Sequence, residues 1–203
     1  MANANSPNGI IPVAYRSGAP YNGAVRTYYV PVGNATALYI GDPVILITNS
    51  GDGNGVQTVE IASAGTTNTS LTYAILGAFM GRSNSAGTAT IGITQGTSVY
   101  LPASTAAYIY VSDDPTLLYE VQEDSVGGAL ASGAAGRNAP LVAGTGSTYT
   151  GQSGWQLQSS NIGTAAYQMR IIQLLQSGNN AIGTNAKWLT YINNHPWTQG
   201  TGI

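Results

Sequence analysis

Cysteine is absent from the 203-residue chain, and histidine occurs once, as His195. Without cysteine the chain can form neither disulfides nor thiolate metal sites, so packing and hydrogen bonds must supply its stability. A single histidine also argues against the usual tetrahedral zinc site, which combines several His, Cys or carboxylate ligands. We therefore expect no bound metal and no other cofactor.

Charge is also scarce, because charged residues make up 7% of the chain, compared with about 25% in an ordinary globular domain. Six basic and eight acidic residues leave a net charge of -2 and no basic cluster. Phosphate binding depends on such clusters, so we expect neither nucleic acid nor an anionic membrane as a partner. A surface with so little charge is better explained if copies of the chain, or a partner, cover much of it.

Long hydrophobic runs are missing as well. No segment approaches the about 20 apolar residues that a membrane-spanning helix requires. The N-terminal sequence MANANSPNGIIPVAY lacks the basic and apolar regions of a signal peptide. We therefore expect the chain to fold in the cell that makes it, without a membrane partner.

The motifs of common enzymes are missing too. The sequence has no G-x-S-x-G nucleophile elbow. Neither GDGNG nor GTGST has the third glycine at the spacing G-x-G-x-x-G, and no G-K-[ST] of a phosphate-binding loop follows them. A catalytic triad would need a base, and the only histidine, His195, lies beside Pro196 near the end of the chain. We interpret His195 as a terminal surface or interface residue and expect no catalytic residues and no enzymatic activity.

The sequence does contain short apolar runs that alternate with a period of two. They are separated by clusters of Gly, Asn, Asp and Pro, and the chain has 27 Gly and 9 Pro, which is typical of a β-sandwich or barrel. The run QMRIIQLLQ would also fit a helix, but it is short and lies among strands, so we interpret it as a strand. The predicted strands are residues 25–31, 37–40, 43–48, 56–62, 71–80, 98–101, 106–112, 117–123, 140–143, 154–158, 168–176 and 186–193.

These patterns predict a single β domain over residues 1–203. Residues 1–20 contain Pro7, Pro12 and Pro20, so they cannot form a continuous ladder and should be an extended N-terminal arm. Residues 21–203 should form the body. Within it, the segment 49–55 (NSGDGNG) is predicted to be a tight hairpin connection, because Gly and Asn tolerate positive φ.

One stretch, YIYVSDDPTLLYEVQED, holds five of the eight acidic residues. A hairpin could bring them together, and such carboxylates could hydrolyse a glycosidic bond or hold Ca²⁺. However, strand alternation places Glu120 on the face opposite Glu123, and the spacing of a calcium loop is missing. We favour a turn opened by Asp-Asp-Pro at an edge or corner of the fold over an active site. The five carboxylates are Asp113, Asp114, Glu120, Glu123 and Asp124.

Aromatic residues offer a second candidate site, because the chain has 13 Tyr and 3 Trp against 1 Phe. Such rings could stack on sugars; the three tryptophans are Trp155, Trp188 and Trp197. The same residue types also favour strands and interface cores. Because the tyrosines are spread over the whole chain, we favour strand packing and interface contact.

Three stretches resemble the capsid decoration (cement) proteins of tailed bacteriophages: VRTYYVPVGNATALYIGDPV, YIYVSDDPTLLYEVQED and MRIIQLLQSGNNAIGTNAKWLTYINNH. Together they cover about a third of the chain, and the resemblance is one of pattern without a chemical motif. It implies an all-β fold, an antiparallel jelly-roll-like barrel or sandwich with an extended N-terminal arm.

The resemblance also implies a structural virion protein that binds the outside of a phage capsid lattice and stabilises it. Its partners would be the major capsid protein and copies of itself, with a trimer favoured over a dimer, and it would be made in the host cytoplasm. Tyr15, Arg16 and Arg26, on or beside the arm, would be contacts to the lattice. The alternative is a carbohydrate-binding β-sandwich module of a head fibre or host-adhesion protein, which would need a cleft with an exposed tryptophan.

Overall fold

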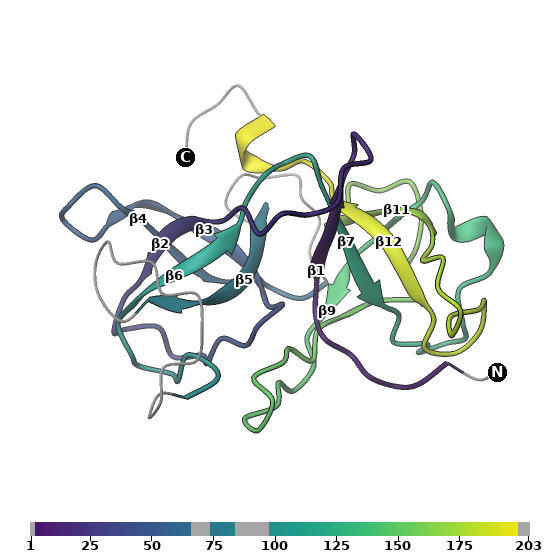
Figure 1. Cartoon of the computed structure of the whole chain (residues 1–203), viewed down its shortest axis with the longest axis horizontal. Helices are drawn as coiled ribbons and strands as arrows, with labels where there is room; N and C mark the ends of the chain where they lie inside the picture. The colour runs from purple at the N-terminus through teal and green to yellow at the C-terminus, as the bar shows by residue number, and fades with distance from the viewer. Residues whose placement is uncertain (1–2, 66–73, 84–97, 199–203) are drawn as a thin grey trace.

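The computed structural model describes residues 3–65, 74–83 and 98–198 (Figure 1). A closed barrel and a five-stranded sheet pack together in a sandwich-like arrangement and share a hydrophobic core. Two short 3-10 helices, η2 (Ser132–Ala134) and η3 (Pro196–Thr198), accompany the strands. The predicted all-β fold class is confirmed.

The barrel is closed by five strands. In order around the barrel they are β2 (Arg26–Val30), β4 (Gln57–Ile61), β3 (Pro43–Gly51), β5 (Ile75–Ser83) and β6 (Ala107–Ser112). β2 and β4 run parallel, and the other neighbours are antiparallel. Val44 and Leu46 of β3 belong to the barrel's own core, whereas Ile45 between them belongs to the core shared with the sheet. Burial on both faces explains the continuous apolar run PVILIT in this strand.

The second sheet is entirely antiparallel. Its order is β1 (Ile11–Tyr15), β7 (Leu117–Gln122), β12 (Lys187–Ile192), β11 (Met169–Leu174) and β8 (Asn138–Ala139). A small two-stranded sheet pairs β9 (Leu141–Val142) with β10 (Gln156–Leu157). Leu117, Tyr119 and Val121 alternate into the shared core, so the predicted period of two operates in β7.

Most predicted strands form, including 168–176, whose strand interpretation is confirmed by β11. Two predicted strands, 37–40 and 98–101, are wrong, because they make only isolated bridges, one of which joins Leu38 to Leu101. Both leucines are fully buried in the barrel core. The apolar residues of these two segments therefore indicate burial, although the segments form no regular strands. Residues 71–73 of the predicted strand 71–80 lie outside the described residues.

The predicted hairpin connection at 49–55 is confirmed. β3 and β4 pair up to Gly51 and Gln57, so the chain reverses between these two residues. Asn49, Gly53 and Gly55 all have positive φ, as the composition of the segment predicted.

The N-terminal arm is extended, but it does contribute to a ladder. β1 pairs with β7, and a register shift between Pro12 and Ala14 marks a bulge. The ladder is interrupted there, in line with the expected lack of a continuous ladder, but Pro12 does not keep β1 out of the sheet. β1 lies at the edge of its sheet, where proline and bulges are both tolerated, because one side of an edge strand needs no ladder hydrogen bonds.

Candidate functional site

The acidic stretch 108–124 forms the crossover between the two halves of the molecule. β6 pairs with β2 and β5 and thereby closes the barrel, whereas β7 pairs with β1 and β12. The hypothetical hairpin between these strands is wrong, because both edges of β6 are already occupied. Residues 113–116 instead carry the chain from the barrel to the sheet.

Asp114 opens the turn of this crossover. Its carboxylate Oδ1 accepts hydrogen bonds from the Thr116 backbone N–H at 2.7 Å and from the Thr116 hydroxyl at 2.6 Å. This is the turn-forming role of aspartate that the sequence favoured.

The other acidic residues of the stretch have separate partners. Glu120 forms an ion pair with Lys187 of the neighbouring strand β12. Glu123 is fully buried, accepts the Leu130 backbone N–H at 2.7 Å, and has its pKa raised by burial. Asp124 accepts the Ser159 backbone N–H at 2.9 Å. The predicted placement of Glu120 and Glu123 on opposite faces agrees with this pattern of burial.

Within residues 3–65, 74–83 and 98–198, no group of three or more His, Asp or Glu side chains is arranged to hold a metal ion. The carboxylates of the crossover accept hydrogen bonds from the chain's own donors, or pair with a lysine in the case of Glu120.

Asp113 is the buried centre of the crossover, with 4% of its surface exposed. Its Oδ2 accepts hydrogen bonds from the Tyr28 hydroxyl at 2.6 Å, from Arg26 Nη1 at 3.2 Å and from the Trp197 indole Nε1 at 3.2 Å. These donors come from β2 and from η3, which are far apart in the sequence. Asp113 thus ties the barrel, the crossover and the C-terminal 3-10 helix together.

The prediction that His195 is a surface or interface residue is wrong, because only 2% of it is exposed. Its Nε2 donates to the Leu76 carbonyl oxygen of β5 at 2.6 Å, and its Nδ1 accepts the Trp197 backbone N–H at 3.2 Å. This pattern requires the neutral imidazole, and burial lowers the His195 pKa accordingly. The ring fastens η3 to the barrel and thereby positions Trp197.

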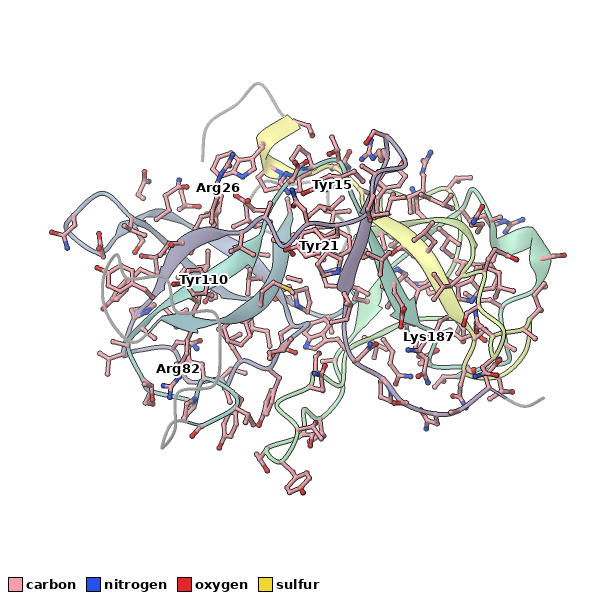
Figure 2. All side chains as sticks on the ribbon, viewed as in Figure 1. Tyr15, Tyr21, Arg26, Arg82, Tyr110 and Lys187 are labelled. Carbon is pink, nitrogen blue, oxygen red and sulfur yellow. The ribbon has the colours of Figure 1, made fainter. Side chains whose placement is uncertain are left out.

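The three residues predicted as contacts, Tyr15, Arg16 and Arg26, all lie around this crossover. Arg16 donates to the Pro115 carbonyl oxygen at 3.0 Å. Arg26 reaches Asp113, yet 67% of its side chain is exposed. Figure 2 shows Tyr15 and Arg26 toward the top of the view, with Arg26 above the barrel and Tyr15 where the barrel meets the sheet. Whether they contact a partner stays a prediction.

Three further aromatic residues complete this surface. Tyr21 lies beside Tyr15, with 6.3 Å between the ring centroids, and Tyr191 lies under the Arg16 guanidinium, which is 4.0 Å from its ring centroid. Trp197 is 41% exposed. We call this set the junction surface; it comprises Tyr15, Arg16, Tyr21, Arg26, Tyr191 and Trp197.

Sequence reasoning named Trp197 only among the tryptophans that could stack on sugars, and it missed Tyr21 and Tyr191. Tyr191 and Trp197 lie more than a hundred residues from the arm. Nothing local in the sequence connects them with Arg16 or Asp113. Only the pairing of β12 with β7 and the docking of η3 bring them to the junction.

The tryptophans are mostly structural. Trp155 is 3% exposed and Trp188 is 1% exposed, and both belong to the shared core. Trp155 lines a hollow of about 250 Å³ together with Tyr39 and Asp42, but little of its ring reaches solvent. This supports the preference for strand packing over a sugar-stacking platform at these two positions.

No protein-family model matches the chain, and neither a curated protein nor a solved structure is significantly similar to it. Among the residues that the structure describes, no helix is long and apolar enough to cross a membrane.

Proposed function

We propose that this protein is a structural virion protein that binds the outside of a phage capsid lattice and stabilises it as a decoration protein. The observation that carries the proposal is the junction surface, which gathers tyrosine, tryptophan and arginine at one edge of a chain with very little charge. The resemblance of the three sequence stretches to cement proteins supplies the kind of partner. That partner is the major capsid protein, and the chain acts as a homo-oligomer, with a trimer favoured.

The residue types of the junction surface favour protein binding. Tyr, Trp and Arg are the side chains enriched at the energetic centres of protein interfaces, because they combine large apolar area with a polar end. Arg16 and Arg26 are also held in place by their contacts with Tyr191 and Asp113. Side chains that are already ordered lose less conformational entropy when a partner binds.

An enzymatic role has less support from the described residues. The only histidine is buried and uses both ring nitrogens for hydrogen bonds within the chain. The carboxylates of the crossover hold backbone and side-chain donors, so they do not form an exposed acid and base pair. We propose a binding protein in preference to a catalyst.

A carbohydrate-binding module is the weaker alternative. It needs an exposed tryptophan in a cleft, whereas Trp155 and Trp188 are buried. Trp197 is partly exposed, but its indole N–H is bound to Asp113. Low charge also suits a lattice, because neighbouring copies of the protein then repel one another little. Many modest contacts over the lattice make release of the protein slow.

The proposal is tested by the copy number of the protein in purified virions, measured by quantitative mass spectrometry relative to the major capsid protein. We expect a fixed ratio close to that of a lattice-wide component. A few copies per particle would indicate a fibre or tail component, and absence from the particle would contradict the proposal.

The same particles test the junction surface. The measurement uses particles that lack the protein. We expect Arg26→Ala to lower the affinity for these particles by about tenfold or more, because an ordered interface arginine is lost. Arg137→Ala is the matched control, since Arg137 is exposed, follows η2 and does not belong to the junction surface. Equal binding of the two variants would remove the junction surface from the interface.

A further inference from the structure

The connection between β9 and β10 is a second exposed feature of the molecule. Residues 143–155 leave the small sheet and project from the body at the bottom of the view in Figure 1. The yellow C-terminal helix η3, which carries Trp197 of the junction surface, lies at the top of the same view. The loop and the junction surface therefore point in opposite directions.

The loop is held in one conformation by its own hydrogen bonds. The Ser147 N–H donates to the Gln152 carbonyl oxygen at 2.9 Å, and the Gly151 N–H donates to the Ser147 carbonyl oxygen at 2.8 Å. The Ser147 hydroxyl oxygen also accepts the Thr150 N–H at 3.1 Å. These bonds close the tip of the loop around residues 148–150.

The base of the loop is fastened to the barrel side. Ile40 donates its N–H to the Gly151 carbonyl oxygen at 2.8 Å, and Ser153 donates its N–H to the Ile40 carbonyl oxygen at 2.9 Å. Gly146 lies against the Tyr39 ring so closely that an added Cβ would be 2.3 Å from it. Tyr39 in turn stacks on Tyr100, with 4.9 Å between the ring centroids. The glycine is required here because no side chain fits between the loop and this stack.

This ordered loop displays an aromatic side chain that packs against little of its own chain. Tyr149, at the tip, is 92% exposed, which is more than any other large hydrophobic residue that the structure describes as exposed. The sequence of the loop, AGTGSTYTGQSGW, contains no charged residue. A rigid loop with an exposed tyrosine is a preorganised anchor, because the ring contributes a large contact area and loses few rotamers on binding.

We propose that the 143–155 loop inserts Tyr149 into an uncharged, largely apolar pocket of a capsid subunit other than the one that the junction surface contacts. This inference rests on the proposed function and adds a bridging mechanism to it. The absence of charge from the loop fits a neutral pocket. A charged group in the pocket would lose its hydration when the loop binds, and the loop offers no opposite charge to replace it. Because the two contacts face opposite ways, a copy seated between two neighbouring subunits contacts both of them, and each contact raises the effective concentration of the other.

The proposal is tested by titrating purified protein onto virions that lack it and measuring occupancy after sedimentation. We expect Tyr149→Ser to weaken binding by about tenfold or more, and Tyr149→Phe to stay within about threefold of the wild type, because the ring supplies most of the contact. Val126→Ser is the matched control, because Val126 is 63% exposed and lies outside the loop. It should bind like the wild type.

The outcomes separate the two proposals. If the wild type does not bind the particles, the proposed function fails. If the wild type and Tyr149→Ser bind equally well, the proposed function stands and the role of the loop is overturned. Sedimentation velocity of the isolated proteins provides the remaining test: a change of oligomeric state in Tyr149→Ser would identify a contact between copies of this chain and would also overturn the bridge.

Discussion

Individual acidic residues in this protein serve as internal acceptors. Although the chain has only eight Asp and Glu residues, Asp42, Asp113 and Glu123 are each less than 5% exposed. Each of them accepts hydrogen bonds from the backbone or from side chains, at a turn, at the crossover or at a loop. Buried carboxylates are tolerated when such donors replace water, so their burial here is explained by architecture and does not require catalysis.

Asp42 provides a test at this scale. Burial raises its pKa from 3.8 to about 6, although hydrogen bonds from the Ser153 hydroxyl and the Tyr39 N–H act in the opposite direction. A carboxyl group with a higher pKa in the folded state binds its proton more tightly when folded. The free energy of unfolding therefore falls as pH rises through the interval between the two pKa values, and the contribution is constant above it.

We expect Asp42→Asn, which cannot ionise, to lack this dependence. The difference in unfolding free energy, wild type minus variant, should fall by about 2 kcal/mol between about pH 4 and pH 7. Urea denaturation at several pH values measures it. His195 and Glu123 titrate in both proteins, so their contributions cancel in the difference. A difference that does not change with pH would show that Asp42 ionises normally in the folded protein.

At the scale of elements, the backbone of the N-terminal arm lies directly against the backbone of the barrel at Gly41. The Ile10 N–H donates to the Gly41 carbonyl oxygen at 2.8 Å, just before the arm enters β1. Gly41 has φ 94°, and a Cβ at this position would lie 2.1 Å from the Asn8 carbonyl oxygen. Both the backbone conformation and the lack of space require glycine here.

We expect Gly41→Ala to lower the free energy of unfolding by at least about 2 kcal/mol, because the added methyl group strains the backbone and displaces the arm. Gly33→Ala is the matched control, since nothing lies within 4 Å of its Cβ position and its φ is not positive. The control should change stability by less than about 1 kcal/mol. Urea denaturation midpoints compare the two, and equal midpoints would mean that the arm does not need this close contact.

The pairing of elements was less predictable than their existence. The alternation of β7 and the turn chemistry of Asp114 are local, and both could be predicted from the sequence. The partner of each strand is not local. The possible hairpin of β6 and β7 does not form, because β2 and β5 occupy both edges of β6. The same limit applies to the junction surface: Tyr15, Arg16 and Arg26 were proposed from the arm, whereas Trp197 needed the folded chain.

At the scale of the whole molecule, the barrel and the sheet share one core. Ile45 and Ile75 of the barrel strands pack in the same cluster as Tyr119 and Trp188 of the sheet. Neither half could lose its partner without exposing this cluster to water. We therefore expect the two halves to unfold together.

Tryptophan fluorescence tests this expectation, because Trp155 and Trp188 lie in the shared core and the barrel strands contain no tryptophan. Far-UV circular dichroism follows both halves. We expect the two signals to give the same denaturant midpoint within error. A circular dichroism transition that is separate from the fluorescence transition would show that the barrel unfolds independently of the sheet.

The sequence by itself determined the fold class, the position of most strands and the scarcity of charge on this protein. These properties depend on local alternation, on turn-forming residues and on composition, which are present before the chain folds. The tertiary structure alone decided that residues 113–116 cross between a barrel and a sheet, that His195 is buried, and that Trp197 joins Arg26 at Asp113. Those contacts join segments that are far apart in the chain. They form only when the pairing of the strands has brought these segments together.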